Sequence, residues 1–216
     1  MALEPNIVQR LYSGSFASQY ETTLPDAFSN FKRKAYQDSK LKKGDHVLVF
    51  CCGTGMDFPY ILKKIGKEGK ITGVDFSADM LKAARDKIDY YGWDNIELIE
   101  ADVTTLNGHV PNNFDAGVCT LGLSIIKNWE EGYANLVSHV KPGGEIIIGD
   151  MQLATGRKAY FNRLTVFISR NFGGTTEGHG NSLNVQKRLE KDLSEMVKKD
   201  FFLGGYYYCV GRLQRA

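Results

Sequence analysis

The chain has 216 residues, of which 43% are hydrophobic and 24% are charged, an ordinary mixture for a globular protein. Its 27 Lys and Arg against 25 Asp and Glu give a net charge of +2, which is too balanced to indicate nucleic-acid binding by charge alone. This composition excludes a disordered, collagen-like or coiled-coil protein, and no apolar run approaches the ~18 residues of a membrane span. Glycine is enriched, with 23 glycines against 5 prolines.

The N-terminus and the cysteines predict a cytoplasmic protein. The first residues, MALEPNIVQRLYSGSF, contain no charged region followed by an apolar run, so we expect no signal peptide. Three of the four cysteines lie in apolar, strand-like runs, as reduced and buried thiols do. No His and Cys cluster has the spacing of zinc ligands, so we expect no metal site.

Residues 1–43 form the first predicted unit. Aromatic side chains such as Tyr12, Tyr20 and Tyr36 recur along it, and a basic turn at 40–43 follows them. This pattern predicts one or two helices that pack beside a sheet as an N-terminal lid.

Residues 44–150 alternate between strand-like and helix-like patterns and form the predicted cofactor-binding core. Two helices are expected to begin after the capping residues Ser77 and Asn128, the first with an apolar face that reaches Tyr91. Strands separated by helices imply a parallel sheet covered on both faces, so the predicted fold class is α/β. The predicted strands are 46–51, 70–75, 96–101, 114–119 and 145–150.

Residues 151–216 complete a single predicted domain. We expect a substrate-cap insertion at 151–182 with a glycine-rich loop at 173–180, and then a C-terminal helix and β-hairpin at 183–216. The helix should span about 183–199, and two short strands should join at Gly204-Gly205. The basic residues of this helix predict a solvated face with at most a weak attraction to an anionic membrane. These are Lys187, Arg188, Lys191, Lys198 and Lys199.

A strand, a glycine turn and a helix follow one another in VLVFCCGTGMD, residues 47–57. Glycine permits a positive φ and a close approach of the backbone to a ligand, and the helix beyond offers unpaired N–H groups. Asp75 ends the next predicted strand, where a carboxylate can accept hydrogen bonds from both hydroxyls of a ribose. The combination predicts a cofactor that contains adenosine. A nicotinamide loop would carry its third glycine at position 58, where this chain has Phe58, so an NAD(P)-dependent oxidoreductase is the less favoured alternative.

Five segments in order resemble the class I S-adenosylmethionine-dependent methyltransferases: VLVFCCGTG, ITGVDFSADMLKAAR, IELIEADVTTL, FDAGVCTLGLS and LVSHVKPGGEIIIGDM. The resemblance implies a Rossmann-like, seven-stranded, mostly parallel sheet whose last strand is antiparallel. It also implies a set of residues that bind S-adenosyl-L-methionine. These are Cys51, Gly53, Thr54, Gly55, Asp75, Phe76, Met80, Asp102, Val103, Cys119 and Thr120.

Two positions depart from that family. The family usually carries an acidic residue, which helps to hold the amino end of the cofactor, where this chain has Val49, and a glycine where it has Cys51. These departures keep open a third reading, a non-catalytic member that binds only the cofactor or a partner.

The nearest likeness within the family is to quinone-biosynthesis methyltransferases and related small-molecule and lipid-headgroup enzymes. Residues 16–21, 31–34 and 120–123 resemble their N-terminal, Trp-Arg-Arg and fourth-strand segments. The likeness implies a quinone-like, phenolic, amine or lipid-headgroup acceptor. No Asn/Asp-Pro-Pro-Tyr/Phe follows the fourth strand, which argues against DNA or RNA as the substrate.

Methyl transfer by in-line displacement needs alignment of the acceptor and exclusion of water, and a hydroxyl acceptor also needs a base. The candidates for this base are His179, Tyr20 and Asp150. We expect His179 to lie in a mobile loop, Tyr20 in the N-terminal lid, and Asp150 at the end of the fifth strand. The sequence leaves open the acceptor, the need for a base and the oligomeric state.

Overall fold

The computed structural model describes residues 4–14, 16, 20, 26–106 and 110–214. Of the predicted N-terminal segment 16–21, only Phe16 and Tyr20 therefore lie within the described residues. Among the helices that these residues form, none is long and apolar enough to cross a membrane.

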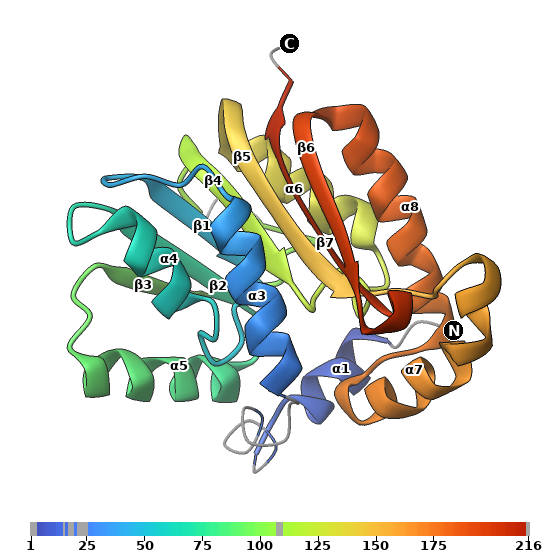
Figure 1. The fold of residues 1–216 in the computed structure, drawn as a ribbon. Coiled ribbons are helices and arrows are strands. Elements are labelled where there is room, and N and C mark those ends of the chain that lie inside the picture. The colour runs from blue at the N-terminus through green and yellow to red at the C-terminus, as the bar shows by residue number, and fades with distance from the viewer. Residues whose placement is uncertain (1–3, 15, 17–19, 21–25, 107–109, 215–216) are drawn as a thin grey trace.

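The described strands make one seven-stranded sheet of order β3-β2-β1-β4-β5-β7-β6 (Figure 1). Neighbours from β3 to β5 pair in parallel, whereas β7 runs antiparallel to both β5 and β6. The predicted α/β fold with an antiparallel last strand is confirmed. The strands are β1 His46–Phe50, β2 Lys70–Asp75, β3 Ile96–Glu100, β4 Phe114–Thr120, β5 Val140–Met151, β6 Leu193–Phe201 and β7 Tyr206–Leu213.

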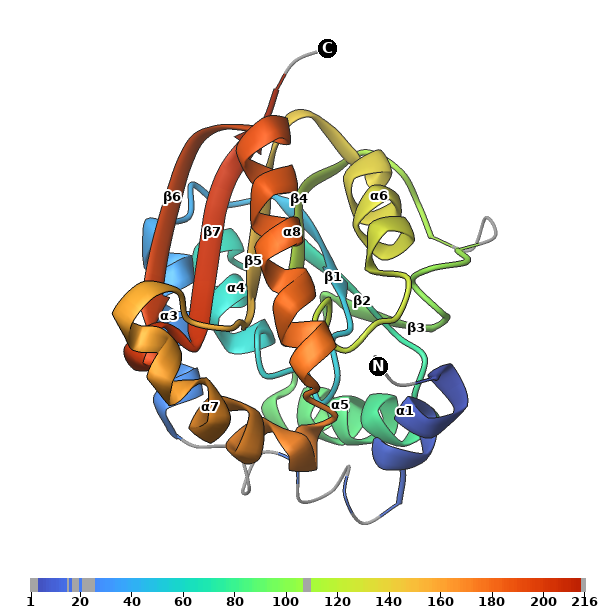
Figure 2. The same ribbon diagram turned by 90° about the vertical axis from the view of Figure 1, so that its right-hand side faces the viewer.

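Helices cover both faces of the sheet (Figures 1 and 2). Side chains alternate along β1, so Val47 and Val49 pack toward α3, α4 and α5, while Leu48 and Phe50 pack toward α6 and α8. The helices are α1 Pro5–Leu11, α3 Asp26–Asp38, α4 Phe58–Ile65, α5 Ala78–Tyr91, α6 Trp129–His139, α7 Asn162–Ser169 and α8 Thr176–Asp192. Short 3₁₀ helices are η1 Gly156–Phe161, η2 Arg170–Phe172 and η3 Phe202–Gly204.

The helix starts predicted after Ser77 and Asn128 are correct, with differences in detail. The Ser77 hydroxyl accepts a hydrogen bond from the Met80 N–H at 3.3 Å, which caps α5. Asn128 precedes α6, but its side chain makes no capping hydrogen bond. Tyr91, expected on the apolar face of α5, is exposed, because the helix ends there at Gly92 in the left-handed conformation.

The C-terminal third differs most from the sequence prediction. The helix expected at about 183–199 begins seven residues earlier, as α8, and ends at Asp192, so Lys198 and Lys199 lie on β6 instead. The charges of β6 resemble a solvated helix face, but β6 is an edge strand, where charged side chains are common. The hairpin turns at Gly204-Gly205 as predicted, with longer strands than expected.

The glycine-rich segment predicted to be a mobile loop is partly the first turn of α8. Thr175 caps this helix by accepting from the Gly178 N–H at 3.0 Å. Gly178 has no room for a side chain, because a Cβ there would lie 1.9 Å from the Ser124 carbonyl oxygen. The close approach seats the beginning of α8 against the loop that follows β4, and it buries His179.

We expect Gly178→Ala to lower the free energy of unfolding by about 1–3 kcal/mol, since the methyl group must push α8 away from Ser124. Gly180→Ala is the matched control. A Cβ at position 180 meets nothing within 4 Å, so the better helix former should raise stability by about 0.5–1 kcal/mol. Urea unfolding followed by circular dichroism measures both. Equal effects of the two variants would contradict this packing of α8.

Candidate functional site

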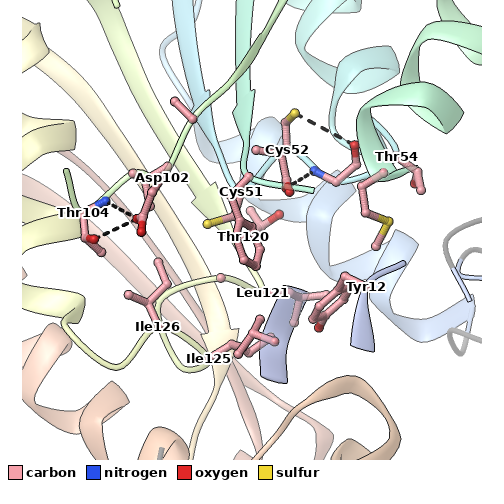
Figure 3. A pocket seen from close by; sticks show the side chains of 18 of the residues that line it. Tyr12, Cys51, Cys52, Thr54, Asp102, Thr104, Thr120, Leu121, Ile125 and Ile126 are labelled. Atoms are coloured by element: carbon pink, nitrogen blue, oxygen red, sulfur yellow. Dashed lines mark hydrogen bonds between the residues drawn. The ribbon is translucent and has the colours of Figure 1, made fainter. Parts of the chain in front are cut away.

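The main cavity, of about 280 Å³, lies at the carboxyl ends of β3, β2, β1 and β4. Figure 3 shows Asp102 and Thr104 on one side of it and Thr54 on the opposite side, with Cys51 and Thr120 between them. All the residues predicted to bind a cofactor line this cavity except Gly55 and Cys119. The sequence therefore brings together side chains from four strand ends, as the parallel topology requires.

The turn after β1 has an unusual backbone. Cys51, Gly53 and Gly55 all have positive φ, of 51°, 54° and 76°. Cys51 therefore keeps the left-handed conformation that glycine adopts without strain, at a cost of roughly 1–2 kcal/mol. Gly55 lies behind the cavity, where a Cβ would come within 2.5 Å of the Phe58 ring. Its glycine is explained by packing against α4.

Asp75 connects the ends of β1 and β2. Its carboxylate accepts from the Gly53 N–H at 2.8 Å and from the Ser77 N–H at 3.0 Å. Burial raises the pKa of Asp75, and these backbone donors oppose the rise. A carboxylate has about four acceptor positions, so capacity remains for ligand hydroxyls.

The β3 side of the cavity is part polar and part apolar. Asp102 accepts through one oxygen, Oδ1, from both the N–H and the hydroxyl of Thr104, each at 2.8 Å (Figure 3). Val103 follows Asp102 after β3, and Phe76 and Met80, which follow the neighbouring β2, also line the cavity. An apolar wall with an acceptor at its rim suits a flat heteroaromatic group with an exocyclic amine.

A buried ion pair at the β1–β4 side was missed by sequence reasoning. Lys32 Nζ, on α3, lies 2.7 Å from Asp57 Oδ2, just before α4, and both side chains are almost fully buried. The Thr120 hydroxyl hydrogen-bonds to both members, and the Tyr36 hydroxyl donates to Asp57 at 2.9 Å. Lys32, Asp57 and Thr120 line the cavity.

Val49, the departure from the family pattern, does not line this cavity. It is buried in the cluster that contains Tyr36 and Phe58. The acidic residue nearest in the chain to the glycine turn is Asp57. Asp57 accepts from Tyr36, which packs in the same cluster as Val49. Sequence periodicity could not find the pair, because a lysine in a polar helix such as α3 usually faces solvent.

A second, smaller cavity of about 30 Å³ adjoins the first at the end of β5. Tyr12, Tyr20, Leu121 and Ile125 line both cavities and form the wall between them. The three predicted catalytic candidates, His179, Tyr20 and Asp150, all line this second cavity. Tyr12 is held in the wall by donating a hydrogen bond to the Phe172 carbonyl at 2.7 Å.

His179 and Asp150 have perturbed pKa values. Burial lowers the pKa of His179 to about 4, and neither ring nitrogen has a hydrogen-bond partner among the described residues. The prediction that His179 lies in a mobile loop is therefore wrong, because His179 is fully buried in the first turns of α8. Burial raises the pKa of Asp150 to about 6 against hydrogen bonds from the Ser124 N–H and hydroxyl, at 2.8 and 2.5 Å.

Comparisons with known proteins agree with this geometry. A family model described as a methyltransferase domain matches residues 47–144. The chain is 30% identical over 156 residues to a demethylmenaquinone methyltransferase of Desulfitobacterium hafniense (strain Y51), a match over 69% of this chain and 61% of that protein. It is also 30% identical to a 2-phytyl-1,4-naphtoquinone methyltransferase of Nostoc punctiforme, over 66% of this chain and 65% of the relative. The matches thus span less than two thirds of these relatives.

The fold has a matching solved structure, a SAM-dependent methyltransferase from Aquifex aeolicus. It is 19% identical, with a TM-score of 0.67, and the match covers 98% of this chain and 99% of that one. The likeness extends beyond the domain match to both flanks of the core. Residues 47–144 therefore match a methyltransferase domain, and the whole chain has the fold of a SAM-dependent methyltransferase.

Proposed function

We propose that the protein transfers a methyl group from S-adenosylmethionine to a hydroxylated aromatic small molecule of the quinol or phenol class. The observation that carries this proposal is the pair of adjoining cavities at the carboxyl ends of the parallel strands, separated by a wall that includes Tyr12 and Tyr20. The larger cavity has the chemistry of a cofactor site, and the smaller has an aromatic lining and the His179 imidazole, which has no hydrogen-bond partner among the described residues.

The larger cavity suits the cofactor from one end to the other. Asp102 and the apolar wall at β3 would take the adenine, and Asp75 at β2 would take the ribose hydroxyls. Its volume of about 280 Å³ is close to the ~300 Å³ at the lower end of small-molecule sites. When bound, the cofactor supplies a methyl group already activated by its sulfonium.

Lys32 and Asp57 would hold the amino-acid end of the cofactor. That end is a zwitterion, and a buried ammonium beside a buried carboxylate offers one partner to each of its charges. Three strand spacings separate β3 from β4, roughly 14 Å, so the pair lies at the far end of the cavity from Asp102. Asp57 would thus supply the acidic group that is absent at Val49.

The smaller cavity would receive the acceptor. The rings of Tyr12, Tyr20, Phe28 and Phe172 line it, and such rings favour a flat aromatic partner. Its volume of about 30 Å³ is well below the ~150 Å³ of a protein cavity that takes benzene, so the acceptor must displace part of the wall. Movement of Tyr12 or Tyr20 would join the two cavities and leave the acceptor beside the methyl donor.

His179 would serve as the proton acceptor for the hydroxyl of the substrate. With a pKa of about 4, its imidazole is neutral at pH 7 and can accept a hydrogen bond. Burying an imidazole without partners is costly, and a bound hydroxyl would remove that cost. Asp150 would act as a positioning residue, because its carboxylate holds Ser124 in the loop beside both cavities.

Turnover tests this function directly. Purified protein with S-adenosylmethionine should methylate at least one member of a panel of quinols and phenols, and liberated S-adenosylhomocysteine reports the reaction. Methylation of amines alone would contradict the acceptor class. Cofactor binding without turnover on any acceptor would favour the non-catalytic reading instead.

The cofactor assignment predicts different effects at the two ends of the site. Asp75→Ala should weaken the binding of both S-adenosylhomocysteine and 5′-methylthioadenosine by about 1.5–3 kcal/mol, because both ligands carry the ribose. The double variant Lys32→Met with Asp57→Asn should lower the affinity for S-adenosylhomocysteine about ten- to hundredfold. Its affinity for 5′-methylthioadenosine should stay unchanged, because only S-adenosylhomocysteine has the amino-acid group. Titration calorimetry measures all four affinities.

The paired change removes both charges together, so that no uncompensated charge stays buried, and it keeps an acceptor for the Tyr36 hydroxyl. Lys34→Met, on the exposed side of α3, is the matched control and should bind both ligands like the wild type. If the paired variant lost affinity for both ligands equally, Lys32 and Asp57 would be structural only.

The proposed roles of His179 and Asp150 predict separable effects. His179→Gln should lower kcat by ~100-fold or more without changing the affinity for S-adenosylhomocysteine, since a general base contributes a factor of that size. The exposed His46→Gln is the control. In the wild type, kcat/KM should fall as pH drops through about 6, where Asp150 takes up a proton, and fall again near 4, where the base His179 takes one up. The limb near pH 6 should disappear in Asp150→Asn; a limb that persists there would assign it to another group.

A further inference from the structure

One segment of the chain carries a strong local charge. Residues 151–176 contain no Asp or Glu but four basic residues, Arg157, Lys158, Arg163 and Arg170. The whole chain has a net charge of +2, so the residues outside this segment are net negative. Residues 156–172 of this segment fold as one helical stretch of η1, α7 and η2, and the side chains of all four basic residues are exposed.

Four large apolar side chains of this stretch are exposed: Tyr160, Phe161, Leu164 and Phe167. Tyr160, Leu164 and Phe167 follow one another at spacings of four and three residues and are 86%, 49% and 71% exposed. Thr165 and Ser169, on the opposite side, are buried. The usual arrangement of a surface helix is therefore reversed, with small polar groups turned inward and large apolar groups outward.

The tip of the C-terminal hairpin extends this apolar area. Phe202 and Leu203 in η3 are 42% and 54% exposed. Both have positive φ, 51° and 55°, a strained conformation for bulky residues. The tip lies against η1, since a Cβ on Gly204 would lie 3.6 Å from Lys158 Cδ. We call Tyr160, Phe161, Leu164, Phe167, Phe202 and Leu203 the outer apolar surface.

The outer apolar surface lies at the end of the sheet that holds both cavities. Figures 1 and 2 show α7 and the hairpin tip at the carboxyl ends of the parallel strands. The register agrees, because Met151 at the end of β5 pairs with Tyr206 directly after the tip. Ser169, Phe172 and Gly174, at the end of this stretch, line the smaller cavity.

We propose that the outer apolar surface and its four basic residues dock the protein on an anionic lipid bilayer. Aromatic and aliphatic groups ringed by Arg and Lys, with no acidic residue among them, match the headgroup and acyl boundary of such a membrane. The long basic side chains can reach phosphates while their stems stay in the apolar layer. Docking does not depend on the identity of the methyl acceptor.

The basic face predicted on α8 is less suited to this contact. Its cations are interspersed with Glu190 and Asp192, and Arg188 Nε lies 2.6 Å from Asp192 Oδ2. Docking through α7 instead brings the wall of the smaller cavity next to the bilayer. A lipophilic acceptor could then enter that cavity from the membrane.

Co-sedimentation with vesicles tests the proposal. The full chain should bind vesicles of equal parts phosphatidylcholine and phosphatidylglycerol, with weaker binding at high salt and little to phosphatidylcholine alone. Arg163→Glu with Arg170→Glu, and separately Tyr160→Ser with Phe167→Ser, should each reduce binding at least tenfold. Lys187→Glu with Lys191→Glu makes the same charge change on α8 and should leave binding unchanged.

Circular dichroism and S-adenosylhomocysteine affinity should be unaltered in every variant, which shows that the fold and cofactor site remain intact. Wild-type binding by the variants of residues 160–170, or equal loss in the α8 control, would overturn the proposal. So would self-association of the chain that Phe167→Ser abolishes, because the surface would then join two copies of the protein.

Discussion

The hydrogen bond from the Gly53 N–H to the Asp75 carboxylate, at 2.8 Å, fixes the geometry on which the rest of the site depends. It joins the turn after β1 to the end of β2, the two strands at the middle of the cavity. The donor can point at Asp75 only because the chain turns through left-handed φ values at Cys51 and Gly53. The strain at Cys51 is tolerated because the surrounding sheet holds the turn on both sides.

From this turn the site extends in the order of the strands. Polar groups line the larger cavity at the ends of β3, β2, β1 and β4, and the smaller cavity follows at the end of β5. Two groups beside the cavities are costly to bury: the Lys32–Asp57 pair, and the imidazole of His179, which finds no hydrogen-bond partner in the part of the chain that the structure describes. Both groups line a cavity, where a bound ligand would provide the interactions that offset the free-energy cost of burying them. The outer apolar surface lies at the same end of the sheet as the two cavities, and we propose that it docks on a bilayer.

The sequence predicted the local parts of this arrangement well. The strand ends and the Ser77 cap follow from short motifs in which each residue is close in the chain to its partners. Asp75 was predicted from its place at the end of the strand after the glycine turn and Asp102 from the family resemblance, and both line the cavity. The antiparallel last strand followed from the family resemblance and is confirmed.

The parts that were missed depend on contacts between distant residues. Lys32 meets Asp57 across 25 positions, and no periodicity records a pairing of that kind. The start of α8 is set by the approach of Gly178 to Ser124, which turned an expected loop into a buried helix. β6 was mistaken for helix because its stability comes from pairing with β7, while its own residues are charged and exposed.

The most direct test of the central claim is a crystal structure of the protein with S-adenosylhomocysteine. We expect adenine beside Asp102 and Val103, ribose hydroxyls on Asp75, and the amino-acid group between Lys32 and Asp57, with the sulfur facing the wall of Tyr12 and Tyr20. A ligand bound outside this cavity, or one whose amino-acid group points away from Lys32 and Asp57, would contradict it.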